Sequence, residues 1–240
     1  MAAHIGTSGW AYIEWKPSFY PTELPQRRFL EHYGSVFNAC EVNATFYRLQ
    51  TQSTVERWAA ETPADFRFAA KLHRRLTHSR EPAADDDWFD FMEDFLESVA
   101  PLGTRLGILL MQFPASRRRD DGALARILDA LPPDVPSALE FRHESWGDNS
   151  IADRAAEKNA TVCLTDTTGD VPDRLPGGPA AYVRLRADRY TEAQRDGWLR
   201  LLEREGAERP VFAFAKHKDI PAGDEFRGVG LAEWLQGGLS

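Results

Sequence analysis

Eight short apolar segments recur along this chain, and helical or irregular segments separate them. We expect β-strands at residues 4–10, 36–43, 66–71, 106–113, 138–146, 160–165, 180–186 and 210–215. Strands that alternate with helices are typical of α/β folds with a parallel sheet. The count of eight favours a single TIM-type (β/α)8 barrel over a doubly wound sheet, which is the alternative. A chain of 240 residues suits one such barrel, so we expect residues 1–240 to form a single domain.

The segments between the predicted strands differ in how clearly they predict helices. Trp88, Met92, Phe95 and Val99 form the strongest helical stripe, which indicates a helix packed on the core. Residues 167–179 are instead rich in Gly and Pro. We therefore expect the sixth connection to be abbreviated, so that the sixth or seventh unit of the barrel is irregular.

An aromatic-rich loop is expected between residues 9 and 25. Its members are Trp10, Tyr12, Trp15, Phe19 and Tyr20. Aromatic surface of this extent predicts either a cluster packed on the rim of the barrel or a lid over a ligand.

Polar residues share one face of several predicted strands. Side chains alternate along a strand, so Glu140 and Arg142 lie on one face, and Glu41 and Asn43 repeat the pattern. The carboxyl ends of barrel strands meet at one mouth. We expect these side chains to converge there: Glu41, Asn43, Lys71, Gln112, Glu140, Arg142, Asp166, Arg184 and Lys216. Such a cluster is either an internal ion-pair network or an active site.

Composition excludes some classes of function. The chain is 42% hydrophobic and 28% charged, as is typical of globular proteins, and no apolar run approaches the ~20 residues of a membrane span. The formal net charge of -8 argues against broad nucleic-acid binding, which needs a basic surface. The basic run at residues 117–119 is followed by Asp120 and Asp121, which indicates a solvated loop.

The two cysteines indicate a reducing compartment. Cys40 and Cys163 lie in predicted strands without nearby Cys or His, so we interpret them as buried small side chains rather than a disulfide or a zinc site. The first strand begins near His4, which leaves no room before it for a signal peptide. We therefore expect a cytoplasmic protein.

Several groups of residues match a known pattern. They are Gly6–Trp10, Glu41–Asn43, Phe46–Arg48, Thr62-Pro63, Phe66–Phe68, Lys71, Thr77-His78, Gln112–Pro114, Glu140–Arg142, Ser145-Trp146, Asp166 and Tyr182–Arg184. On these residues the chain resembles, nearly end to end, domain-of-unknown-function family 72, the YecE-like family of TIM-barrel proteins. The resemblance implies a barrel with its site at the mouth, but no reaction, since the family has none established.

The chain departs from the family pattern at two strand ends. The family usually shows His-Gly after strand seven and an aromatic residue with paired Asn after strand eight. Here Leu185-Arg186-Ala187 stands at the end of strand seven, and Lys216 and His217 follow strand eight. If a ligand contacts these strand ends, we expect this chain to differ from its relatives in specificity or activity.

The first functional hypothesis is an enzyme with acid-base carboxylates at the barrel mouth and a small anionic or polyhydroxyl substrate, similar to a phosphate or a sugar. The candidate catalytic residues are Glu41, Glu140 and Asp166. The candidate substrate-binding residues are Trp10, Asn43, Tyr47, Lys71, His78, Gln112, Arg142, Trp146 and Arg184. Two carboxylates in unlike environments can act as acid and base, and Arg side chains orient carboxylate or phosphate groups.

Two other hypotheses stay open. No cofactor is predicted, but a metal-dependent hydrolase or isomerase is an alternative, in which Glu41, Glu140, Asp166 and His78 or His143 bind a divalent metal. Against it, the sequence shows no His-rich ligand spacing. The third hypothesis is a noncatalytic binder of nucleotides or single-stranded nucleic acid through aromatic stacking.

Overall fold

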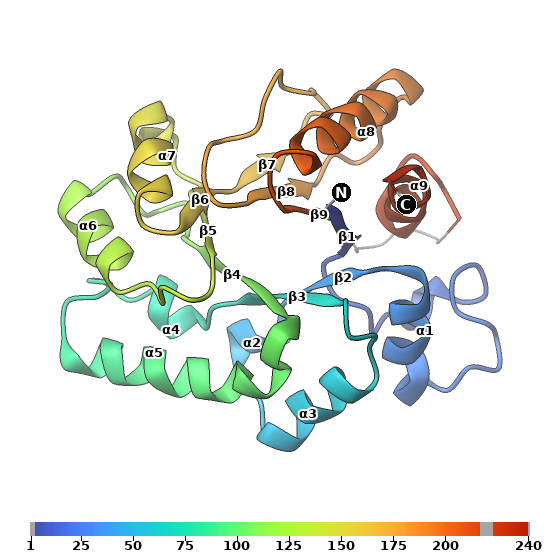
Figure 1. Ribbon diagram of the computed structural model, residues 1–240, viewed down its shortest axis with the longest axis horizontal. Helices are drawn as coiled ribbons and strands as arrows, with labels where there is room; N and C mark the ends of the chain where they lie inside the picture. The colour runs from blue at the N-terminus through green and yellow to red at the C-terminus, as the bar shows by residue number, and fades with distance from the viewer. Residues whose placement is uncertain (1–2, 217–222, 240) are drawn as a thin grey trace.

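The computed structural model describes residues 3–216 and 223–239. Its strands are β1 (Ala3–Thr7), β2 (Ala39–Val42), β3 (Arg67–Lys71), β4 (Leu106–Gln112), β5 (Ser137–Glu140), β6 (Ala160–Val162), β7 (Leu164–Asp166), β8 (Ala181–Leu185) and β9 (Val211–Ala215). Its α-helices are α1 (Phe29–Val36), α2 (Ala44–Tyr47), α3 (Gln52–Ala60), α4 (Arg74–Thr77), α5 (Asp86–Val99), α6 (Asp121–Asp129), α7 (Asn149–Ala156), α8 (Glu192–Gly206) and α9 (Gly228–Leu239). Short 3-10 helices span Ile13–Trp15, Gln26–Arg28, Ala100–Arg105 and Glu144–Trp146. The longer helices surround the strands, which confirms the predicted α/β barrel class (Figure 1).

Hydrogen-bonded ladders divide the described strands into two parallel sheets. One sheet has the order β1-β9-β8-β7 and the other the order β2-β3-β4-β5-β6. A bridge between Ser8 and Glu41 joins the two sheets on one side. On the other side the predicted sixth strand breaks at Cys163, so that β6 pairs with β5 and β7 pairs with β8. This break is why the described residues form nine strands where eight were predicted.

Side chains hold β1 beside β2 where a full ladder is missing. Tyr33 of α1 places its hydroxyl between the strands, where it accepts a hydrogen bond from Thr7 N (2.7 Å) and donates one to Ala39 O (3.0 Å). The amide of Asn38 bonds two backbone atoms of β1 at 2.7 and 2.8 Å. A Cβ atom at Gly6 would lie 1.9 Å from Ala39 O, so only glycine permits this close approach.

Strand alternation creates two layers inside the ring of strands. A buried apolar cluster fills the interior with Ala39, Ala69, Ile108, Leu110, Ala138, Cys163, Ala180, Tyr182, Phe212 and Phe214. Two positions further along five of these strands, toward their carboxyl ends, stand polar residues: Glu41, Lys71, Gln112, Glu140 and Arg184. Because side chains two residues apart share a face, the polar layer lies directly beyond the apolar one.

Two of the connections between strands can be compared with their prediction from the sequence. Residues 167–180 contain no helix, as predicted for the sixth connection. In the aromatic-rich loop, Trp15 and Tyr20 are buried, and Tyr20 stacks on Phe29 of α1 with 3.8 Å between ring centroids. Because of these contacts, the greater part of this loop forms a packed aromatic cluster, the first of the two predicted alternatives.

Several strands are shorter than predicted, and the first one ends at Thr7 rather than at residue 10. The predicted strand 36–43 begins only at Ala39, because α1 continues to Val36. The predicted strand 138–146 leaves its ladder after Glu140, and a 3-10 turn follows at Glu144–Trp146. Arg142 therefore lies in a loop rather than on the strand.

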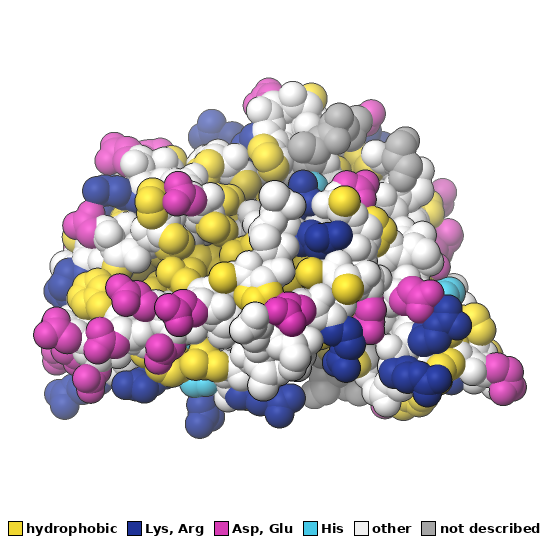
Figure 2. Space-filling model, turned by 60° about the horizontal axis from the view of Figure 1, so that its bottom comes forward, with side chains coloured by type: hydrophobic (Ala, Val, Ile, Leu, Met, Phe, Trp, Pro, Cys, Tyr) yellow, Lys and Arg dark blue, Asp and Glu magenta, His cyan; other side chains and the backbone are white. Residues whose placement is uncertain are grey.

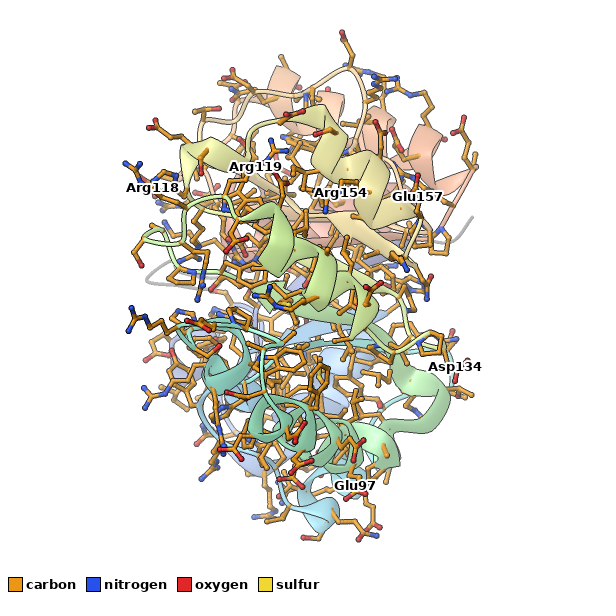
Figure 3. All side chains as sticks on the ribbon, turned by 90° about the vertical axis from the view of Figure 1, so that its left-hand side faces the viewer. Glu97, Arg118, Arg119, Asp134, Arg154 and Glu157 are labelled. Atoms are coloured by element: carbon orange, nitrogen blue, oxygen red, sulfur yellow. The ribbon has the colours of Figure 1, made fainter. Side chains whose placement is uncertain are left out.

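The outer surface is strongly charged. The exposed face of α5 is acidic, with Asp86, Asp87, Asp90, Glu93, Asp94 and Glu97 (Figure 2). Near α6 and α7, Arg119 and Arg154 both pair with Asp121, and Arg118 extends from the surface (Figure 3). Within the basic run 117–119, Arg119 pairs with acids, whereas Arg117 is half-buried and donates to the backbone oxygens of Ser79 and Arg80. No helix in the described part of the chain has the length and apolar character that crossing a bilayer requires.

Candidate functional site

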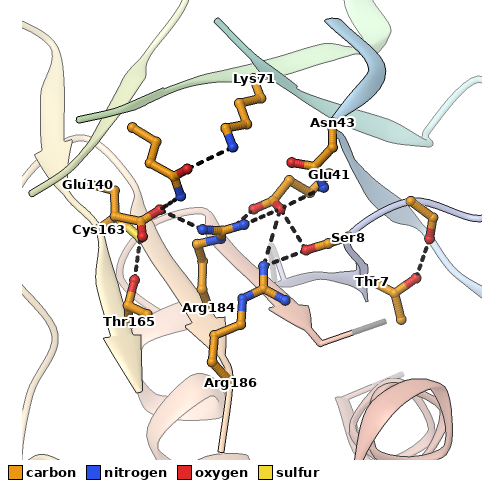
Figure 4. A network of polar contacts seen from close by, with 12 residues as sticks. Thr7, Ser8, Glu41, Asn43, Lys71, Glu140, Cys163, Thr165, Arg184 and Arg186 are labelled. Carbon is orange, nitrogen blue, oxygen red and sulfur yellow. Dashed lines mark hydrogen bonds and ion pairs between the residues drawn. The ribbon is translucent and has the colours of Figure 1, made fainter. Parts of the chain in front are cut away.

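Glu41 is the most enclosed charged group of the polar layer. Its side chain is 0% exposed. Arg184 donates to both of its oxygens, Nε to Oε2 at 2.9 Å and Nη2 to Oε1 at 2.8 Å. Ser8 and Arg186 add further hydrogen bonds to Oε1 (Figure 4). Tyr182 donates a hydrogen bond to Oε2 at 2.9 Å. Each carboxylate oxygen thus has at least two donors.

Glu140 forms the second carboxylate centre of the layer. Arg184 Nη1 donates to Glu140 Oε2 at 2.6 Å, so one guanidinium links both glutamates. Gln112 Nε2 donates to the same oxygen at 2.5 Å, and Arg142 Nε donates to Oε1 at 3.0 Å. Gln112 in turn accepts a hydrogen bond from Lys71 Nζ at 2.7 Å (Figure 4). A continuous polar chain therefore crosses the interior from β3 to β8.

A pocket of about 820 Å³ opens over this network. Its lining residues are Tyr12, Asn43, Tyr47, Lys71, Glu140, Phe141, Arg142, Thr165, Thr167, Arg184, Arg186 and Lys216. Five of these side chains are cationic and one is a carboxylate. The volume lies within the roughly 300–1,000 Å³ typical of small-molecule sites. The pocket therefore presents an excess of positive charge in a protein whose net charge is -8.

The network shifts the proton affinities of its members. Burial alone would raise the pKa of Glu41, but Arg184 and Arg186 hold it well below its usual range. Burial also opposes ionisation of Glu140, yet Arg184 and the Gln112 amide keep its pKa lowered. Both glutamates are therefore ionised at neutral pH.

Lys71 differs from the two glutamates. Burial lowers the pKa of Lys71 to about 8, and the nearby positive charge of Arg184 acts in the same direction. A fraction of its amine is thus unprotonated near neutral pH.

Most of the predicted site residues converge here. Asn43, Tyr47, Lys71, Glu140, Arg142 and Arg184 line the pocket, and Gln112 and Glu41 lie directly behind it. Arg186 and Lys216, the residues that depart from the family pattern, also line it. His217 lies outside the described residues.

Four predicted site residues lie elsewhere. Asp166 accepts hydrogen bonds from Gly169 N (2.8 Å) and Tyr190 (2.7 Å), so its carboxylate closes the turn after β7. Trp10 packs edge-on against Trp58, with 5.4 Å between ring centroids. Neither residue is among those that line the pocket.

Trp146 and His78 are also displaced from the pocket. Trp146 stacks on Phe141 and lines a separate pocket of about 550 Å³ between α7 and the irregular connection. His78 accepts or donates a 2.8 Å hydrogen bond with Thr77 and lies edge-on to Phe46. Burial lowers the pKa of His78, and the charge of Lys71 lowers it further.

Several residues of the site were not predicted as part of it. Ser8, Tyr182 and Arg186 contact Glu41, and Phe46 lies 4.0 Å from Lys71 Nζ, measured to its ring centroid. The two-residue alternation of strands places Tyr182 and Arg186 on the face of Arg184, so the sequence contained that signal. In the described residues, no group of three or more His, Cys, Asp or Glu is arranged to hold a metal ion.

The fold and the site define a TIM-barrel-like α/β protein with an ion-paired, cation-rich pocket at the carboxyl ends of its strands. Residues 4–225 match the family described as "Protein of unknown function DUF72", and the chain belongs to this family. The resemblance inferred from the sequence is thereby confirmed.

Two proteins named UPF0759 are similar to this chain in sequence. The UPF0759 protein YunF of Bacillus subtilis (strain 168) is 32% identical over 207 residues, which cover 82% of this chain and 72% of YunF. The UPF0759 protein YecE of Escherichia coli (strain K12) is 33% identical over 144 residues, 60% of this chain. That match spans 49% of YecE, about half of its length.

Solved structures share the architecture. A DUF72 family protein from Thermotoga maritima MSB8 has a TM-score of 0.74 at 22% identity, over 98% of this chain and 97% of that one. D-psicose 3-epimerase from Clostridium cellulolyticum H10, solved with D-tagatose, has a TM-score of 0.55 at 12% identity, over 98% and 90%. At these identities the similarity describes the fold alone.

Proposed function

We propose that this protein is an enzyme that binds a small anionic or polyhydroxyl substrate in the 820 Å³ pocket at the carboxyl ends of its strands. One observation carries the proposal: five cationic side chains and a single carboxylate line the pocket. Arg and Lys side chains bind phosphate and carboxylate groups through charge-assisted hydrogen bonds. The hydroxyls of Tyr47, Thr165 and Thr167 supply partners for substrate hydroxyls.

The two glutamates take different roles in this proposal. Glu140 lines the pocket, is ionised and is therefore the proton acceptor. Glu41 is not among the lining residues, so a substrate in the pocket does not contact it. Its role is to hold Arg184 and Arg186 in place.

The cations also divide by exposure. Arg142 and Lys216 are 48% and 33% exposed, so both can contact an incoming anion at the mouth. Arg184 is held by both glutamates and is 7% exposed. We therefore assign substrate capture to Arg142 and Lys216, and charge balance in the interior to Arg184.

The two cysteines are free and buried, which supports the cytoplasmic location that we propose for this enzyme.

Binding and turnover test the proposal separately. Calorimetric titration with inorganic phosphate and with phosphorylated sugars should show saturable, salt-sensitive binding, whereas unphosphorylated sugars should bind more weakly. Conversion of a bound sugar phosphate, followed by NMR, should disappear in Glu140→Gln. Absence of anion binding, or conversion that persists in Glu140→Gln, would contradict the proposal.

A further inference from the structure

Lys71 occupies an unusual position among the cations of the pocket. It is the last residue of β3 and is 8% exposed, yet its side chain lines the pocket. Its Nζ donates to Gln112 Oε1 and lies 4.0 Å from the centroid of the Phe46 ring. One neutral amide and one aromatic face thus form its nearest surroundings.

The other lining cations all have carboxylate partners. Arg184 pairs with both glutamates, Arg142 with Glu140, Arg186 with Glu41 and Lys216 with Asp188. Among the described residues, Lys71 has no ion pair. An ammonium group that only held the network together would be expected beside a carboxylate, since burying an unpaired charge is costly.

The surroundings of Lys71 favour its neutral amine. The charged or titratable groups that face it are Glu41, Glu140, Arg142, Arg184 and His78. Burial is the largest influence on the pKa of Lys71, and the net result is a pKa of about 8. A lysine that is desolvated beside other cations is the kind that acts as a nucleophile toward carbonyl groups.

We propose that Lys71 is the nucleophile of the site and forms a Schiff base with the carbonyl carbon of an anionic aldehyde or ketone bound in the pocket. This inference rests on the proposed function and names its substrate class. Arg142 and Lys216 hold the anionic group of the substrate, and the carbonyl group reaches inward to Nζ.

The reaction needs no partner beyond the carbonyl compound. The Nζ lone pair attacks the carbonyl carbon, and the electron pair of the C=O bond moves to oxygen, which takes a proton from the amine. The resulting carbinolamine loses its oxygen as water together with the second amine proton, while the nitrogen lone pair forms the C=N bond. Amine and carbonyl compound thus become imine and water, without oxidation or reduction.

A Schiff base also explains how Glu140 can serve as a base. Its pKa is lowered, so it removes only protons that the substrate makes acidic. When the imine nitrogen takes up a proton from solvent, the resulting iminium draws electrons from the adjacent carbon and acidifies the protons there. Lys71 and Glu140 are connected through Gln112, which places electrophile and base in one pocket.

Reductive trapping tests this inference on the intact protein. The protein is incubated with dihydroxyacetone phosphate, then treated with sodium borohydride and digested for peptide mass spectrometry. We expect the peptide with Lys71 to gain the mass of the probe less one oxygen atom, while Lys158 and Lys216 stay unmodified. Lys71→Arg keeps the charge and should lose the adduct. Inorganic phosphate should slow trapping, and hydroxyacetone, which lacks the phosphate, should label poorly.

Calorimetric binding of dihydroxyacetone phosphate without borohydride separates the two proposals. Binding without an adduct at Lys71, or with labelling at Lys216 instead, overturns the Schiff-base inference and leaves the proposed function standing. Absence of both binding and adduct overturns both. Mapping of the adduct in the unmodified chain does not depend on whether Lys71→Arg folds.

Discussion

Arg184 and Glu41 face each other through two parallel hydrogen bonds of 2.9 and 2.8 Å, and both side chains are buried. A bidentate pair of this kind fixes the guanidinium plane as well as its position. Because Nη1 of the same group also reaches Glu140, the orientation set by Glu41 determines where Arg184 meets the pocket. Glu41 therefore positions Arg184 in the site, although Glu41 itself does not line the pocket.

Glu41→Gln should destabilise the protein at neutral pH. The change removes the charge that compensates the buried guanidinium of Arg184 and the partly buried one of Arg186. Breaking a buried pair in this way costs about 3–5 kcal/mol. Urea unfolding followed by tryptophan fluorescence measures the loss. Glu93→Gln on the exposed face of α5 is the matched control and should change stability by less than about 0.5 kcal/mol.

The loss of unfolding free energy caused by Glu41→Gln should become smaller at acidic pH. The folded pKa of Glu41 lies below the ordinary value of 4.5, so its ionised form stabilises the folded state above that value. As pH falls below 4.5, the wild type loses this stability and the variant does not. A difference between the two proteins that stayed constant with pH would contradict the assignment of the charge to Glu41.

The wild type should gain stability as pH rises from about 8 to 10.5, and Lys71→Met should lack this gain. The folded pKa of Lys71 is about 8 and the ordinary value is 10.5, so between them the unfolded chain binds more protons. Wild-type stability relative to Lys71→Met should therefore rise over this interval, by roughly 1.4 kcal/mol for each unit that separates the two values. Unfolding curves across the interval measure it. The exposed Lys158 gives the matched variant Lys158→Met, which should behave as the wild type does.

The convergence of the inner polar side chains could be predicted from the sequence, and physical reasons explain this. Glu41, Lys71, Glu140 and Arg184 lie on strands, where the two-residue alternation of the backbone decides the direction of each side chain. Once the barrel was inferred, their convergence followed without knowledge of any contact. The fold class was confirmed for the same reason, since alternating periodicities are visible in the chain itself.

Prediction was weaker beyond the strand ends. Trp10 and Trp146 lie in connections whose course depends on tertiary packing, and both turn onto apolar neighbours instead of the pocket. Asp166 ends a strand, but Tyr190 and a nearby turn bind its carboxylate. Sequence spacing does not show which of several partners a polar side chain at a strand end will choose.

Arg142→Ala should weaken anion binding with little effect on folding. The side chain is 48% exposed, and Glu140 keeps Arg184 and Gln112 as donors when Arg142 is lost. A hydrogen bond to a charged group contributes about 1.5–3 kcal/mol, which corresponds to a roughly tenfold to hundredfold rise in Kd for phosphate. Calorimetry measures the change, and Arg57→Ala on α3, a comparably exposed arginine, should leave Kd unchanged. An unaltered Kd in Arg142→Ala would remove Arg142 from the binding site.

Tyr33→Phe should weaken the junction between the two sheets. The Tyr33 hydroxyl bonds Thr7 N and Ala39 O, and all three residues are 0% exposed. Without it, a buried N–H and a buried carbonyl lose a partner, at a cost of about 1–3 kcal/mol. Urea unfolding measures the loss, and hydrogen exchange should show faster exchange at Thr7 than at amides within β4. Tyr47→Phe, at a side chain that is 70% exposed, is the matched control and should be nearly neutral. Equal stability of Tyr33→Phe and the wild type would show that the ladder bridge at Ser8 and Glu41 suffices to hold β1 beside β2.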